Sequence, residues 1–343
     1  MLEWIEVRDF RCHEHVKLEL HPDATFLIGR NARGKTSLLE AICMLLRLQS
    51  PRTTSRQEMV RHDTKTAMVE GRYMGRKLRN AFSTAQRRLA VDDAICGRSQ
   101  DYLSATGPLV WMDHSDMNLL RGGSECRRRY LDATCSQITP AYLAALRNYD
   151  RALRSRNYTL KRDAVINWRQ ADAYARIMEQ DATVIWQVRA AVVERAKAPA
   201  DTALKALSEG SENMTLHFRQ GASSDALQQV LLDSRADEER TRSTAAGPHR
   251  DDIEIFLNQR DASTFASEGQ QRSLSLAMKL AQATLLQESL GCAPLLLMDD
   301  VFGELDPIRR SILLNHLPTD SQKIITTTGG TWLDENLGRH YQI

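Results

Sequence analysis

The pattern Gly-Arg-Asn-Ala-Arg-Gly-Lys-Thr at residues 29–36 constrains this chain more than any other feature. It fits G-x-x-x-x-G-K-[ST], and it lies between an apolar run that predicts a strand, residues 25–28, and a helix that begins near Ser37. Glycines in such a loop let backbone N–H groups converge on phosphate oxygens, and the helix N-terminus adds its dipole. Because both required neighbours are present, we predict a nucleotide-binding loop.

The loop assigns roles to its polar side chains. Lys35 is expected to reach the β- and γ-phosphates of ATP, and Thr36 is expected to bind Mg²⁺. The predicted nucleotide-binding residues of the loop are Gly29, Arg30, Asn31, Ala32, Arg33, Gly34, Lys35, Thr36 and Ser37. ATP and Mg²⁺ are therefore the expected cofactors.

A carboxylate partner for Mg²⁺ follows a second apolar run. Residues 295–300 read Leu-Leu-Leu-Met-Asp-Asp, so Asp299 ends a predicted buried strand and can face the phosphate loop. Asp300 then stands where a water-activating carboxylate is expected. A simple turn after a strand is the alternative interpretation, but it does not explain the pairing with a phosphate loop. We predict catalytic roles for Lys35, Asp299 and Asp300, with Thr36 and Asp299 as metal ligands.

A third motif, Ser-Glu-Gly-Gln-Gln-Arg at residues 267–272, opens a long predicted helix before the Asp299 strand. It resembles the signature loop of ABC-type ATPases. A serine hydroxyl and a glycine N–H at a helix start form a second anion site, which in that superfamily grips the γ-phosphate held by a different protomer. The resemblance implies an ATP-sandwiched homodimer with nucleotide contacts from Ser267, Gly269 and Gln270. Residues 304–306 also resemble the superfamily's D-loop, although helix capping alone explains them.

The predicted elements alternate strands and helices at both ends of the chain and are helical in between. The expected fold is α/β: an ABC-type P-loop ATPase head, with a mixed sheet and flanking helices, plus an inserted, mainly α-helical arm domain. We expect the N-terminal part of the head at residues 1–112, the arm at 113–215 and the C-terminal part of the head at 216–343. One arm helix is expected over residues 161–197, about 55 Å long if continuous, and strands at 216–218 and 253–256 are expected to rejoin the head.

Charge is distributed unevenly along the chain, although the net charge is only +2. Residues 52–161 hold 20 Lys and Arg against 11 Asp and Glu, a net +9, which leaves −7 for the remainder. Such segregation favours a surface that faces a polyanion, and ordinary solvated arginines or ion pairs within the arm are the alternatives. The candidate contacts to such a polyanion, which the family resemblance given below implies to be DNA, are Arg127, Arg128, Arg129, Arg151 and Arg154.

Composition argues against several other classes of protein. No apolar run approaches the roughly 20 residues of a membrane-spanning helix, and no basic stretch followed by an apolar core begins the chain, so a cytoplasmic protein is expected. The six cysteines are scattered without a CxxC pair, which argues against a zinc site and a disulfide scaffold. Only 6% of residues are aromatic, so for a nucleic-acid partner, which the resemblance given below implies, duplex or junction DNA is favoured over a single strand stacked along the protein.

Several longer stretches narrow the resemblance to one family, the RecF recombination-repair ATPases of bacteria. The matching stretches are residues 34–42, 127–132 with 136–137, 247–252, Phe10 with Arg11, Tyr142 with Leu143, Tyr149, Arg156 with Asn157, and the threonines 326–328. The chain departs from the family pattern at Ala32, which replaces a glycine of the loop, and at a P-E-D-L segment, where His114, Ser115 and Met117 replace the proline, glutamate and leucine. A non-glycine residue at a positive φ would be strained, so Ala32 bears on the geometry of the loop.

The RecF resemblance implies ATP-dependent head-to-head dimerisation on duplex or junction DNA, and weak DNA-stimulated ATP hydrolysis that releases the DNA. It also implies a role in recombinational gap repair, replication restart and the SOS response, with RecO and RecR as partners. A RecF-like ATPase serving phage defence and an ABC transporter subunit stay open as alternatives. Transporter subunits usually have a short helical insert, whereas 232 positions separate Lys35 from Ser267 here. The sequence gives no physical account of residues 247–252.

Overall fold

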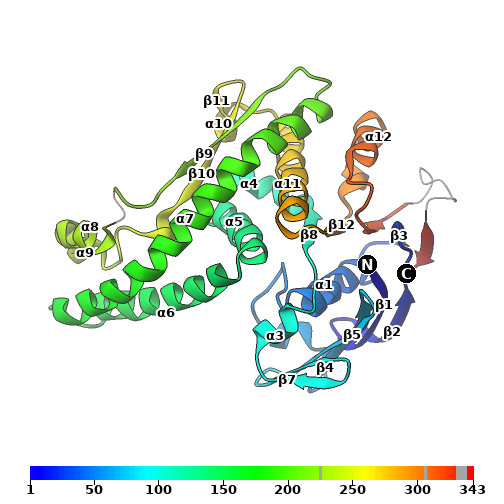
Figure 1. Ribbon diagram of the computed structural model, residues 1–343, viewed down its shortest axis with the longest axis horizontal. Coiled ribbons are helices and arrows are strands. Elements are labelled where there is room, and N and C mark those ends of the chain that lie inside the picture. Colours follow the sequence, from blue (N-terminus) through cyan, green and yellow to red (C-terminus); the bar gives the residue numbers. More distant parts are fainter. Residues whose placement is uncertain (224–225, 305–306, 330–337) are drawn as a thin grey trace. The chain divides into compact units, whose positions relative to one another are not determined.

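Figure 1 shows the computed structural model, which describes residues 1–343 apart from 224–225, 305–306 and 330–337. The chain divides into two compact units. The first comprises Met1–Ser115 and Leu286–Ile343, and the second comprises Asp116–Leu285. The first unit holds the predicted phosphate loop and Asp299, and the second holds Ser267.

A parallel sheet forms the nucleotide-binding side of the first unit. Its strand order is β14 (Arg339–Gln342), β3 (Ala24–Ile28), β13 (Lys323–Thr327), β12 (Leu295–Asp299) and β8 (Leu109–Asp113). Every neighbouring pair in this order is parallel, so the carboxyl ends of the strands lie at one edge. The inner strands are buried on both faces, which explains their unbroken apolar runs.

An antiparallel sheet forms the rest of the first unit. Its order is β2 (His13–Glu19), β1 (Leu2–Phe10), β4 (Ala67–Tyr73), β5 (Arg76–Phe82), β6 (Arg87–Val91) and β7 (Ala94–Cys96). Helix α1 (Lys35–Leu46) packs against strands of both sheets and is buried almost all round, as its apolar sequence predicts. One hydrophobic core therefore joins both sheets through α1. Short helices α2 (Arg56–Met59), α3 (Ser99–Leu103) and α12 (Pro307–His316) complete this unit.

Helices dominate the second unit, where α6 (Pro140–Arg162) and α7 (Trp168–Leu207) pack along each other as a long hairpin (Figure 1). With 40 residues, α7 is about 60 Å long. The remaining helices are α4 (Asn118–Arg121), α5 (Ser124–Ile138), α8 (Leu227–Asp233), α9 (Arg235–Thr241), α10 (Ala262–Phe265) and the first part of α11 (Glu268–Leu290). Pro140 is the first residue of α6, a position where its missing N–H removes no hydrogen bond within the helix.

The predicted single helix over residues 161–197 is wrong at its start. Helix α6 ends at Arg162, and α7 begins only at Trp168, where the Asn167 side chain accepts a hydrogen bond from the Gln170 N–H at 3.1 Å. This cap stabilises a helix start inside a region that periodicity alone reads as continuous. At its other end, α7 continues beyond the predicted end at residue 197 to Leu207 and includes Pro199.

The strands expected to rejoin the head instead pair with each other. Strands β9 (Met214–Arg219), β10 (Asp252–Leu257) and β11 (Arg260–Asp261) form a separate sheet in the second unit, in the order β11-β10-β9, and β9 packs against α7. The second unit therefore extends to Leu285, whereas the sequence placed the return to the head at residue 216. Alternation of apolar residues identifies a strand but not its partner, and a different partner accounts for the shifted boundary.

The six cysteines, all of them among the described residues, form no disulfide bond in this structure. Among the residues that the structure describes, no helix is both long and apolar enough to cross a membrane.

Candidate nucleotide site

The phosphate loop connects β3 to α1 and contains two residues in the left-handed region of φ. Gly34, the N-cap of α1, has φ 89°, and Ala32 has φ 64°. A Cβ at position 34 would lie 2.5 Å from His13 Nε2 and 2.6 Å from Cys12 Sγ, so glycine is required by space as well as by φ. Ala32, which replaces a glycine of the family pattern, adopts this left-handed conformation. The conformation destabilises the backbone of an L-residue by on the order of 1 kcal/mol.

Lys35 is buried and points back into the loop. Its Nζ donates hydrogen bonds to the carbonyl oxygens of Gly29 at 2.6 Å and Arg30 at 3.0 Å. The ammonium group is thus surrounded by the backbone that the motif predicts to cradle phosphates. The role of Lys35 as the cation that faces the β- and γ-phosphates stays a prediction.

Thr36 and Asp299, predicted from separate motifs, are in direct contact. Asp299 ends β12, in register with Thr326 of β13 on one side and Asp113 of β8 on the other. The Thr36 hydroxyl lies 2.9 Å from Asp299 Oδ1 and 2.7 Å from Oδ2. Parallel pairing brings Asp299 to the strand edge at which the loop begins, and this contact follows from that arrangement.

The donor chemistry at this point fits Mg²⁺. A threonine hydroxyl and one carboxylate are hard oxygen donors, and Mg²⁺ in nucleotide sites usually adds phosphate and water oxygens to one or two carboxylates. Consistently, among the described residues no group of three or more His, Cys, Asp or Glu side chains could hold a metal ion by itself. Thr36 and Asp299 are therefore the residues that would hold Mg²⁺ together with a nucleotide.

Asp300 begins the turn that leaves β12 and has φ 53°. Its N–H donates to Thr326 Oγ1 at 2.9 Å, and its carboxylate lies beside Gly303, where an added Cβ would be 2.8 Å from Oδ1. The water-activating role of Asp300 stays a prediction. Residues 305–306 of the expected D-loop lie outside the described residues.

The predicted signature loop forms a capping box at the start of α11. The Ser267 N–H donates to Gln270 Oε1 at 2.8 Å, and the Gln270 N–H donates to Ser267 Oγ at 3.4 Å. Gln270 also donates to Glu212 at 2.8 Å, so its side chain is engaged within the second unit. Ser267 is exposed, and its role in binding an anion held by a second protomer stays a prediction.

The first three candidate DNA-contact arginines have partners within the second unit. Arg127 binds both carboxylate oxygens of Asp252, at 2.6 and 2.9 Å, and these hydrogen bonds raise the pKa of Arg127. Arg128 donates to the Asp251 carbonyl at 2.9 Å. Arg129 makes an exposed ion pair with Glu125 at 2.5 Å, one of the alternatives that the sequence left open. Two of the three are therefore partly buried structural groups.

Arg151 and Arg154 are instead exposed on α6. They belong to a row of exposed side chains at helical spacing, which we call the basic stripe: Arg147, Arg151, Arg154, Tyr158 and Lys161. Spacings of three and four residues place these side chains on one face of the helix. The stripe could be read from the sequence by that spacing, but burial of the neighbouring Arg156 could not.

Residues 247–252 form the polar centre of the second unit. The buried Asp251 accepts hydrogen bonds from Arg189 Nη1 at 2.7 Å and from Trp186 Nε1 at 3.0 Å. Arg189, also buried, donates to Asp132 at 2.7 Å as well. The segment therefore joins α5, α7 and the start of β10, and its contacts give it a structural role.

His249 connects this centre to α6. Its Nδ1 lies 2.7 Å from the Tyr149 hydroxyl, and its Nε2 lies 3.1 Å from the Thr244 carbonyl oxygen. Burial lowers the pKa of His249 to about 4, so the ring is neutral at pH 7. Gly247 has φ 132°, and a Cβ there would lie 2.3 Å from the Tyr149 hydroxyl.

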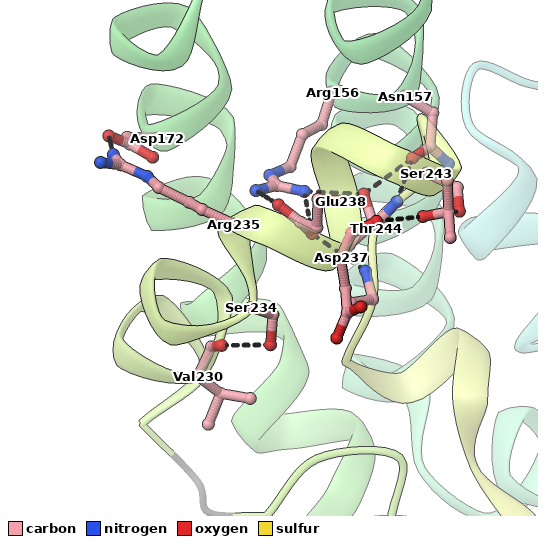
Figure 2. Close-up of polar contacts among 12 residues, drawn as sticks. Arg156, Asn157, Asp172, Val230, Ser234, Arg235, Asp237, Glu238, Ser243 and Thr244 are labelled. Carbon is pink, nitrogen blue, oxygen red and sulfur yellow. Dashed lines mark hydrogen bonds and ion pairs between the residues drawn. The ribbon is translucent and has the colours of Figure 1, made fainter. Parts of the chain in front are cut away.

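Figure 2 shows a buried polar network on the inner face of α6. Arg156 Nη1 and Nη2 donate to the two carboxylate oxygens of Glu238 at 2.8 and 2.7 Å, and Nη1 also reaches Thr244 Oγ1 at 2.9 Å. Asn157 accepts from the Thr244 hydroxyl at 2.7 Å. Segment 227–244 is thus fixed to α6 on the face that does not carry the basic stripe.

Arg242 fixes the tip of the hairpin. Its guanidinium donates to the carbonyl oxygens of Leu160, Asp163 and Ala164 at 3.2, 3.0 and 2.9 Å. One side chain thereby satisfies carbonyl groups at the end of α6, which have no partner within the helix.

Taken together, a phosphate loop between strand and helix, a carboxylate ending a neighbouring parallel strand and a serine-glycine motif that opens a later helix define the head of an ABC-type P-loop ATPase. Residues 1–94 match the AAA ATPase domain family. The chain is 33% identical to the DNA replication and repair protein RecF of Synechococcus sp. over 95% of its length and 91% of that protein, and 32% identical to RecF of Bacillus subtilis over 96% and 94%. The chain therefore belongs to the RecF family of DNA replication and repair proteins.

Solved structures agree with this assignment. The chain resembles the recombination mediator protein RecF-ATPrS in the RecFOR pathway with a TM-score of 0.90 and 27% identity, over 100% of this chain and 96% of that one. RecF-ATP gives a TM-score of 0.87 over 97% and 93%. An Smc head at 13% identity and a TM-score of 0.54 shares the fold. Near full-length similarity to RecF supports the repair function over the transporter and phage-defence alternatives.

Proposed function

We propose that this protein binds Mg-ATP at the loop, dimerises head to head around it, and binds DNA in the dimeric state. The contact between Thr36 and Asp299 carries the proposal, because it joins the loop's metal-binding hydroxyl to the acidic residue of the second motif. Family membership and the relative solved as RecF-ATP support ATP as the nucleotide.

Each residue of the site has a defined part in nucleotide binding. Lys35 exchanges the carbonyls of Gly29 and Arg30 for phosphate oxygens, and the backbone N–H groups of the loop bind the remaining oxygens. Mg²⁺, when bound by Thr36 and Asp299, neutralises charge on the phosphates. Asp300 orients the attacking water for hydrolysis. The ATPase activity is weak and stimulated by DNA, as the family resemblance implies.

The signature loop completes the site in a second copy of the chain. The exposed Ser267 hydroxyl and the Gly269 N–H bind the γ-phosphate held by the partner, so ATP acts as a dimerisation ligand. Hydrolysis removes the γ-phosphate and with it this contact. Loss of the contact returns the protein to the monomer and releases DNA.

The basic stripe of α6 is the proposed DNA-contact surface. Its cations are exposed, whereas Arg127 and Arg128 are held by Asp252 and by the Asp251 carbonyl. Contacts of this kind reach phosphates and carry little sequence preference, which suits duplex DNA or a junction between single and double strands. We also propose that the protein acts in the bacterial cytoplasm, in gap repair, replication restart and the SOS response, with RecR and RecO as partners, and membership of the RecF family supports this proposal.

Sedimentation velocity tests this function. The protein is run with Mg-ATP, with ATP plus a chelator, and without nucleotide, each with and without a gapped duplex. We expect a dimer only with Mg-ATP, and stronger DNA binding by that dimer. A monomer under all conditions, or a dimer that forms equally well without nucleotide, would contradict the proposal.

A further inference from the structure

Thr326 occupies a position between the two acidic residues of the site. It lies at the end of β13 and its side chain is fully buried. Its hydroxyl donates to Asp299 Oδ1 at 2.7 Å and accepts from the N–H of Asp300 at 2.9 Å. A hydroxyl has one hydrogen to donate, so both its donor and an acceptor position are committed to these two residues.

We propose that Thr326 is a positioning residue for the Mg-nucleotide site, which orients the Asp299 carboxylate and fixes the turn that carries Asp300. The inference rests on the proposed ATPase function and deepens it. Thr326 itself touches neither nucleotide nor metal in this role. It acts through Asp299, the proposed metal ligand, and Asp300, the proposed water-orienting residue.

Asp299 accepts hydrogen bonds from two hydroxyl groups that lie on different elements. The Thr36 hydroxyl is within hydrogen-bond distance of both carboxylate oxygens, and it can keep donating to Asp299 while a lone pair of its oxygen faces Mg²⁺. Thr326 donates to Oδ1 from the neighbouring strand, so the carboxylate is oriented from a second side. Groups that hold a metal ligand in this way typically change metal affinity or activity by roughly 10- to 100-fold when removed.

Thr326 also stabilises the backbone after the strand. Asp300 has φ 53°, a left-handed conformation that L-residues rarely adopt. The hydrogen bond from its N–H to Thr326 Oγ1 gives this strained amide a buried partner. Without the hydroxyl, the direction in which Asp300 leaves β12 would no longer be fixed.

The adjacent threonine supplies a matched control. Thr327 is also buried in β13, but its hydroxyl donates to the Gly329 carbonyl at 3.0 Å. Thr326→Val and Thr327→Val therefore remove the same group from neighbouring positions of one strand. Only the first removes a contact to Asp299. Thr326→Ser keeps the hydroxyl and serves as the rescue variant.

The experiment measures the Mg²⁺ dependence of binding of a fluorescent, non-hydrolysable ATP analogue, beside steady-state ATP turnover. For Thr326→Val we expect unchanged affinity for the analogue without Mg²⁺, a Mg²⁺ requirement raised about 10-fold or more, and turnover lowered by about 10- to 100-fold. Thr326→Ser should restore both, and Thr327→Val should resemble the wild type.

Wild-type Mg²⁺ dependence and turnover in Thr326→Val would overturn the inference, as would equal losses in Thr327→Val. If the valine variant does not fold, Thr326→Ala is measured against Thr326→Ser in the same way. A wild-type protein that does not bind the analogue at all would instead refute the proposed function.

Discussion

The hydroxyl of Thr36 lies 2.7 Å from Asp299 Oδ2, although 263 positions separate the two residues in the chain. Thr36 is in the first turn of α1, and Asp299 is the last residue of β12. Strand β13 lies between β3, which leads into the loop, and β12, so the parallel sheet places both residues at one edge. The nucleotide site therefore depends on the order of the strands in the parallel sheet. Substitutions of loop side chains should lower nucleotide binding without unfolding the protein.

Lys35→Ala should abolish measurable ATP binding while leaving the fold intact. The variant removes the ammonium group that donates to the Gly29 and Arg30 carbonyls within the loop. Fluorescent-nucleotide titration should show an affinity loss of at least about 100-fold, which corresponds to roughly 2.7 kcal/mol. The exposed Lys65→Ala is the control. Wild-type affinity in Lys35→Ala would remove Lys35 from the site.

Ser267→Arg should bind ATP normally but stay monomeric. A large cation at the exposed start of α11 blocks the partner's γ-phosphate contact, while the loop of the same chain is unchanged. The measurement pairs nucleotide titration with sedimentation in Mg-ATP. Ala164→Arg adds the same side chain at the hairpin tip and should dimerise like the wild type. An ATP-dependent dimer of Ser267→Arg would refute the shared site.

Arg151→Ala and Arg154→Ala should each weaken DNA binding and reduce the slope of log affinity against log salt by about 1. Both residues are exposed, so thermal stability should not change. Arg127→Ala should instead lower thermal stability and leave the salt slope unchanged, because it removes two short hydrogen bonds from the Asp252 carboxylate. Binding to a gapped duplex over a salt series and thermal unfolding separate the two effects. An unchanged salt slope in both α6 variants would place the DNA surface elsewhere.

Stability should fall as the pH is lowered from about 6.5 to about 4, in part through His249. Burial lowers the pKa of His249 from 6.5 to about 4, so within this window the unfolded chain binds a proton that the folded chain does not. The contribution is therefore present above pH 6.5 and lost on acidification. Urea unfolding of the wild type and of His249→Gln at pH 7, 6 and 5 measures it. Parallel pH dependence of the two proteins would show that His249 does not contribute.

Sequence patterns predicted the strand, loop and helix around Lys35 because that structure is local. The loop, its flanking strand and helix, and Asp299 at a strand end are all short patterns whose residue types are dictated by phosphate and metal binding. The sequence marks Thr326 only as part of the threonine run 326–328 that matches the RecF family, and gives it no role in the site. Its contact with Asp299 required knowing that β13 and β12 are neighbours.

Non-local pairing accounts for most of what the sequence did not predict. The strands at 216–218 and 253–256 were recognised, but their pairing with each other was not. Likewise, Arg127 and Arg151 have the same charge and lie in the same helical region. Only the structure shows that one is bound to Asp252 across the fold and the other faces solvent.

The guanidinium of Arg242 gives the hairpin a mechanical property. By donating to three carbonyl groups where α6 gives way to α7, it stabilises the far end of the hairpin against fraying, so the two helices are expected to move together. A molecule that binds anywhere along the outer face of α6 then displaces the hairpin as a whole, and the tip does not unfold first.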